Sequence, residues 1–179
     1  LGMASYAITM KRKGGKDHPN RVALSWTVGC SVMSFVGAGF LGFAHTLPSV
    51  NMYTHGTLVT GMHGHMAFWG AYAMLVLAII SYSMPIMTGR KLHDSTMNVF
   101  AFWTSNIGMV FMTLAFAVAG ITQVYLERRV GLDFLTVQNE IGIHFFGLTL
   151  AACLFTLGIV AYVWNFIRFG LPVDNTSRG

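Results

Sequence analysis

Apolar residues follow one another along this 179-residue chain without the polar faces that helices of a soluble protein need. Three long segments contain no Asp, Glu, Lys or Arg, and these are residues 22–89, 95–126 and 141–167. Each is longer than the roughly 20 apolar residues that cross a bilayer core of about 30 Å. A large soluble core would instead leave charged side chains on the outer face of each helix. The pattern therefore predicts an integral membrane protein.

Proline, glycine and charged positions divide these segments into four membrane spans. Backbone groups inside a bilayer must be hydrogen-bonded within their own segment, so each span is expected to be a helix. A shorter apolar stretch at residues 1–10 is interpreted as the end of a preceding helix. The predicted fold is an all-α polytopic bundle, with residues 1–179 forming a single transmembrane domain. The four helices are expected at about residues 22–46, 57–87, 97–125 and 139–169.

The charged residues predict how the spans are oriented. Only 9% of the chain is charged, against about a quarter in a soluble domain, and the net charge is +5. Nine of the eleven Lys and Arg residues fall on one side of the predicted spans, whereas the other side has only Arg128 and Arg129. Because cytoplasmic loops are enriched in Lys and Arg, the nine mark the cytoplasmic side. The predicted cytoplasmic parts are residues 11–21, 88–96 and the C-terminus, and the predicted outer loops are residues 47–56 and 126–138. No nucleic-acid partner is expected, since topology accounts for the basic charge.

The segment THGTLVTGMHGHMAF (54–68) places His63 and His65 inside the second span. At about 1.5 Å per residue they lie roughly 9–12 Å below the outer surface. Ionisable groups at such depth are costly and are by default read as functional. Residues i and i+2 of a helix differ in direction by about 200°, so the two imidazoles are expected to point to opposite sides. They could not share one metal, but each could bind a different metal centre.

Haem suits this pattern better than zinc, because a haem needs an axial imidazole beside an apolar wall. Gly61 and Gly64 remove bulk next to the pair, and Phe68, Trp69 and Tyr72 supply aromatic surface. The alternative is a pair of core histidines that are hydrogen-bonded to neighbouring helices.

The remaining histidines give weaker signals. His45, His55 and His144 are expected near the outer surface, where they could contact haem propionates or interfacial water. His18 and His93 fall in predicted cytoplasmic loops and are interpreted as solvated.

The histidine segment resembles a known family. Residues 50–85, VNMYTHGTLVTGMHGHMAFWGAYAMLVLAIISYSMP, resemble the antepenultimate helix of the large subunit of cytochrome c-dependent nitric oxide reductase, in the haem-copper oxidase superfamily. The resemblance continues through FAHTLPSVN (43–51), VFMTLAFAVAGITQVYLERR (110–129) and TVQNEIGIHF (136–145). The wider superfamily shares a His-x-His, but the flanking Thr-His-Gly-Thr and Ala-Tyr-Ala-Met favour the nitric oxide reductase branch over cbb3-type oxidases.

The resemblance implies roles for the pair. His63 would be the proximal ligand of a high-spin haem b3, and His65 an axial ligand of a low-spin haem b. His55 joins them as a cofactor-binding residue, near the expected haem propionates. The family's non-haem iron is held by a His followed four residues later by Glu and by an adjacent His-His pair, and neither motif occurs here. We therefore expect this chain to be the C-terminal portion of a twelve-helix subunit, or a piece that assembles with the upstream helices, and to be inactive alone.

The function that the resemblance implies is reduction of two nitric oxide molecules to nitrous oxide and water. Electrons would come from a membrane-anchored cytochrome c subunit on the periplasmic side of a bacterial inner membrane, with lipid around the helices. Three alternatives stay open, which are a cbb3-like oxygen reductase with copper, a dihaem electron-transfer cytochrome without a substrate site, and an assembly subunit without haem.

Glu140 and His144 are four residues apart on one expected helix face, but two ligands are too few for a catalytic metal. Glu140 is interpreted as an interfacial or helix N-terminal charge.

Overall fold

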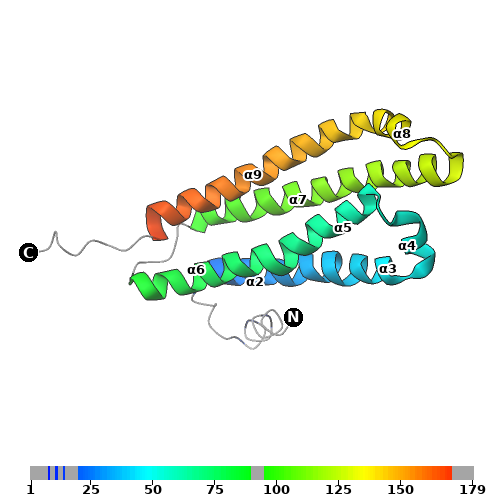
Figure 1. Cartoon of the computed structure of the whole chain (residues 1–179). Helices are drawn as coiled ribbons and strands as arrows, with labels where there is room; N and C mark the ends of the chain where they lie inside the picture. Colours follow the sequence, from blue (N-terminus) through cyan, green and yellow to red (C-terminus); the bar gives the residue numbers. More distant parts are fainter. Residues whose placement is uncertain (1–7, 9–10, 12–13, 15–19, 90–94, 171–179) are drawn as a thin grey trace, which may run out of the picture.

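The computed structural model describes residues 8, 11, 14, 20–89 and 95–170. Most of the helix end expected at residues 1–10 lies outside these residues, as do His18 and His93. The described part contains helices and turns and no strand. Four long helices run alongside one another, joined at one end of the bundle by short helices (Figure 1).

Each long helix corresponds to one predicted span. In chain order they are α2 (Arg21–Ser34) with the π-helical η1 (Phe35–Leu41) and α3 (Gly42–Thr46); α5 (Leu58–Phe68) with the π-helical η2 (Trp69–Ala73) and α6 (Met74–Thr88); α7 (Ser95–Val124) with the π-helical η3 (Tyr125–Val130); and α9 (Gly142–Gly170). All four are long and apolar enough to cross a membrane. The predicted all-α, polytopic fold is confirmed.

Short helices join the long ones where the sequence predicts loops. α4 (Pro48–Thr54) follows the first span and has proline at its first position. Proline suits a helix start because it lacks a backbone N–H, and an N–H at this position would have no partner within the helix. α8 (Phe134–Glu140) precedes the last span, and the side chain of Asp133 caps it by accepting hydrogen bonds from the N–H groups of Leu135 and Thr136. The third helix continues as η3 to Val130 and ends where Gly131 adopts a φ of 84°.

Close contacts between helices occur at glycines. A Cβ on Gly37 of η1 would lie 2.6 Å from the carbonyl carbon of Met66 in α5, and one on Gly108 of α7 would lie 2.7 Å from the Cα of Phe155 in α9. Neither position has room for a larger residue unless the helices move apart. Small residues of this kind let helix backbones approach closely in membrane proteins, where packing drives association.

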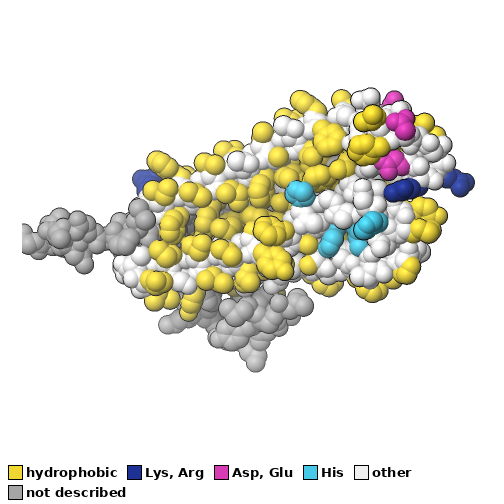
Figure 2. Space-filling model, viewed as in Figure 1, with side chains coloured by type: hydrophobic (Ala, Val, Ile, Leu, Met, Phe, Trp, Pro, Cys, Tyr) yellow, Lys and Arg dark blue, Asp and Glu magenta, His cyan; other side chains and the backbone are white. Residues whose placement is uncertain are grey.

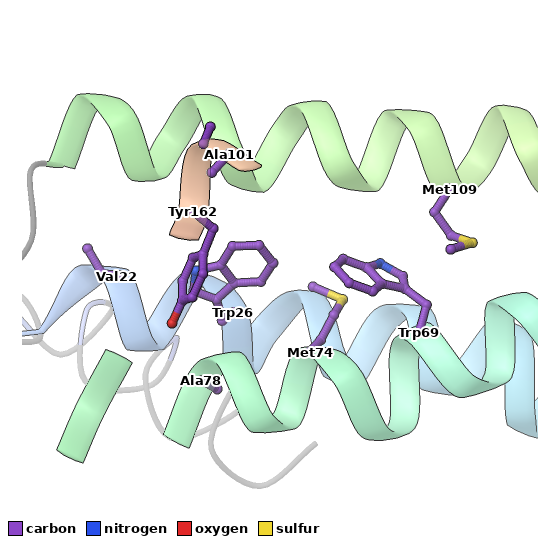
Figure 3. Packing of buried hydrophobic residues seen from close by; sticks show 9 residues of the cluster. Val22, Trp26, Trp69, Met74, Ala78, Ala101, Met109 and Tyr162 are labelled. Atoms are coloured by element: carbon purple, nitrogen blue, oxygen red, sulfur yellow. The ribbon is translucent and has the colours of Figure 1, made fainter. Parts of the chain in front are cut away.

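The buried core lies in the half of the bundle opposite the short helices, between α2, α6, α7 and α9 (Figure 3). Trp26 is fully buried at its centre and makes edge-on contacts with Trp69, Phe102 and Tyr162. Its indole N–H donates to Asn98 at 2.9 Å. With the N–H satisfied, these large rings can be buried at little polar cost. The core stabilises this half of the bundle, and the predicted site lies in the other half, nearer to the short helices.

Candidate functional site

The helix that carries both candidate ligands is anchored at its N-terminus. The hydroxyl of Thr57 accepts a hydrogen bond from the N–H of Val59 at 3.3 Å, and the Gln123 Oε1 on α7 accepts one from the N–H of Leu58 at 2.9 Å. Gln123 is buried, and its amide N–H donates to Glu127 at 2.9 Å, which sets the orientation of the amide. The first turn of α5 is thereby held against α7, and the histidines follow one and two turns later.

His63 is held by the first span. Its Nδ1 lies 2.9 Å from the carbonyl oxygen of Gly37 in η1, and its ring stacks on His45 of α3 with centroids 5.1 Å apart and planes at 25°. A carbonyl oxygen can only accept, so Nδ1 is the donor, and in the neutral imidazole the lone pair is then on Nε2. This tautomer and this kind of backbone partner are typical of histidines that bind metals through Nε2.

His65 is prepared in the same way but faces another helix. Its Nδ1 lies 2.8 Å from the carbonyl oxygen of Gly61, one turn earlier, so its Nε2 also keeps a lone pair. Its ring lies 4.7 Å from the ring of Phe116 on α7. The two imidazoles therefore contact different neighbours, as the i, i+2 spacing predicts. Histidine side chains reach the surface on the face of the molecule drawn in Figure 2, at the border of its apolar region.

Two open grooves adjoin His65. One of about 650 Å³ lies between α5, α7 and α9, and another of about 690 Å³ lies beside Gly61 and Gly64. Apart from His65 and the hydroxyls of Thr149 and Thr156, the side chains that line them are apolar or weakly polar. Volumes of about 300–1,000 Å³ with mainly apolar walls are typical of sites for small molecules and cofactors. A free Nε2, an apolar wall and aromatic neighbours together fit a haem held by His65.

The other predicted positions do not join this pair. His55 is exposed at the C-terminal cap of α4, and His144 lines a separate groove of about 500 Å³ between α7 and α9. Glu140 is the last residue of α8, and α9 begins only at Gly142. The interpretation of Glu140 as a helix N-terminal charge is therefore wrong, and so is its placement on one continuous helix with His144, because the chain turns between them.

The stack of His45 on His63 is a feature that the sequence analysis missed. Local periodicity cannot relate residues on two different helices, and it placed His45 only near the outer surface. The glycines at positions 37 and 42 were the available signal, since a Cβ at Gly42 would lie 3.2 Å from the His63 ring. Among the described residues, no group of three or more His, Cys, Asp or Glu side chains is placed to hold a metal ion.

These features define a class of protein, a helical membrane domain that presents one metal-competent imidazole on each side of a single helix. Residues 1–154 match the family described as cytochrome c and quinol oxidase polypeptide I, and the chain belongs to this family. It is also 37% identical over 182 aligned residues to a subunit of nitric oxide reductase from Stutzerimonas stutzeri. That alignment covers 97% of this chain and 38% of the relative, so the chain spans about two fifths of the relative's length. The resemblance identified from the histidine segment is confirmed.

Proposed function

We propose that this chain forms the haem-ligating part of a respiratory nitric oxide reductase. His63 would bind the high-spin haem b3, and His65 would provide one axial ligand of the low-spin haem b. The observation that carries the proposal is that both histidines have Nδ1 hydrogen-bonded to a backbone carbonyl, which leaves an Nε2 lone pair on each side of α5. The 37% identity to a known nitric oxide reductase chain supports the choice of reaction.

The residues of this chain bind and orient the cofactors. α5 holds the two imidazoles two residues apart, so the two haems would lie close together on either side of one helix. The Gly37 and Gly61 carbonyls hold the orientation of the two imidazole rings, and the apolar side chains of the groove beside His65 would provide an apolar wall for a bound haem. The haems, together with a non-haem iron bound by residues outside this chain, would supply the metal chemistry by which two electrons and two protons reduce two nitric oxide molecules to nitrous oxide and water.

The other parts of the proposal concern the surroundings. The chain would lie in a bacterial inner membrane, with α3, α4 and α8 toward the periplasm, because Lys and Arg are concentrated at the opposite ends of the helices. A membrane-anchored cytochrome c subunit would deliver electrons on the periplasmic side. His55, exposed at the same end, would lie near the haem propionates.

The test is to replace each histidine in the assembled reductase and record reduced-minus-oxidised spectra. His65→Ala is expected to abolish the low-spin haem b signal and leave high-spin haem in place, while His63→Ala has the converse effect. His144→Ala is a matched control, since His144 lies in a separate groove. Equal loss of both signals in each variant, in stably assembled protein, would contradict separate ligation. Two further measurements on the same preparation distinguish the alternatives. In a metal analysis, stoichiometric copper would indicate an oxygen reductase. In a carbon monoxide binding assay, failure to bind would indicate a dihaem electron carrier.

A further inference from the structure

His45 lies 18 positions before His63 in the sequence but stacks directly on its ring. Its Nδ1 lies 2.8 Å from the carbonyl oxygen of Leu41, and its Nε2 is buried without a hydrogen-bond partner among the described residues. A buried nitrogen without a hydrogen bond is unfavourable, so packing alone does not explain a histidine at this position. A phenylalanine would fill the same space without that cost.

We propose that His45 is a positioning residue that holds the imidazole of His63 in the plane required for axial ligation and thereby tunes the haem bound to it. The proposal rests on the function proposed above, in which His63 binds haem. It adds a residue on a different helix that controls the strength of the bond between His63 and iron.

The π-helical segment η1 organises both rings. It supplies the carbonyl of Gly37 to His63 and the carbonyl of Leu41 to His45, and the two acceptors are four residues apart. Each imidazole is thus anchored to η1 through its own Nδ1, and the planes of the two stacked rings are inclined by 25°. π-Helical turns are rare and occur frequently at functional sites.

His63 is consequently constrained on three sides. Gly37 accepts its Nδ1 proton, His45 covers one face, and the Gly42 backbone lies against its Cε1 edge, where even a Cβ would come within 3.2 Å. The hydrogen bond from a ligand's second nitrogen raises the basicity of the ligating nitrogen. Because His45 blocks rotation of the ring away from the Gly37 carbonyl, it sustains that bond and hence a strong donor nitrogen at the metal.

The experiment uses the assembled reductase with two substitutions of His45 and one control. His45→Ala removes the stacked face, and His45→Phe keeps a flat ring but loses the anchor on Leu41. Phe43→Ala is the control, because Phe43 lies on the same short helix and is 65% exposed. The readouts are the iron–imidazole stretching frequency of the reduced high-spin haem, by resonance Raman spectroscopy, and its midpoint potential.

Both His45 variants are expected to lower the stretching frequency and raise the midpoint potential of the high-spin haem, with the larger shift in His45→Ala. The low-spin haem and the Phe43→Ala variant should show no change. An unchanged frequency in both His45 variants would overturn the proposal. His63→Ala measured in parallel identifies which idea has failed: if it leaves the high-spin haem ligated, both the proposed function and this inference are wrong, and if it removes that haem while His45 has no effect, only the inference is.

Discussion

Replacing Gly37 by alanine should separate the first span from the helix that carries the histidines. A Cβ at this position would lie 2.6 Å from the carbonyl carbon of Met66 and 2.7 Å from the nitrogen of Ala67. Both neighbours are backbone atoms of α5, so neither can turn aside as a flexible side chain would. The helices themselves must move.

The size of the movement follows from these distances. Ordinary contact begins at 3.4 Å, so the 2.6 Å approach requires the backbones to separate by about 0.8 Å. Fully transmitted, this would lengthen the 2.9 Å hydrogen bond from His63 to Gly37 to about 3.7 Å, where it no longer holds. Overpacking of this kind typically costs about 1–3 kcal/mol. Replacing a glycine within a helix by alanine would by itself stabilise by about 0.5–1 kcal/mol, so the net effect is expected to be destabilising.

Gly39→Ala is the matched control, because its Cβ would meet nothing closer than 3.8 Å in the same π-helical segment. The assays are thermal unfolding of the detergent-solubilised complex and the content of high-spin haem. Gly37→Ala should unfold at a lower temperature and lose high-spin haem in preference to low-spin haem, while Gly39→Ala should match or exceed the parent protein. Equal behaviour of the two variants would show that close approach at Gly37 does not position His63.

Three further predictions concern topology, helix anchoring and pH. Cysteines introduced at Leu92 and Val130 should be labelled from outside intact cells only at position 130, because Lys and Arg mark the other side as cytoplasmic, and the reverse pattern would invert the topology. Gln123→Leu should destabilise the protein by about 0.5–1.5 kcal/mol, because the part-buried N–H of Leu58 loses the hydrogen bond that it now donates to Gln123. Gln138→Leu on α8 is the control, and equal unfolding midpoints of the two variants would refute this role of Gln123. The hydrogen bond from the Thr136 hydroxyl, and after it the one from the Thr136 N–H, hold the pKa of Asp133 below its usual 3.8. Asp133 therefore stabilises the start of α8 above that pH, and this contribution is lost as the pH falls through the lowered pKa. Hydrogen exchange of α8 amides should show protection declining only below about pH 3.8 and already absent in Asp133→Ala, and protection independent of this carboxylate would contradict the capping role.

The spans and the opposed histidines could be predicted because both depend on short-range sequence properties. The absence of charge marks a helix that can cross a membrane, and a spacing of two residues fixes opposite directions on any helix. The partners of those histidines could not be predicted in this way. Gly37 and His45 lie on another helix, and their contact with His63 depends on how the first span packs against α5. The break between Glu140 and Gly142 was missed because Asp133 starts a separate short helix ahead of the last span.

The π-helical segment η2 also decides which residues of the second span share a face. Four residues of this span are buried at a regular spacing of four positions, and these are Met66, Gly70, Met74 and Ala78. In an uninterrupted α-helix, residues twelve apart such as Met66 and Ala78 would differ in direction by about 120°. A π-turn holds more residues than an α-turn, so η2 removes much of this drift and brings the inner and outer halves of the helix into phase. The span is therefore two α-helices of matched phase. Deleting one residue between Trp69 and Ala73 would rotate the core around Trp26 relative to the part of the helix that carries His63 and His65, without changing the structure of either part.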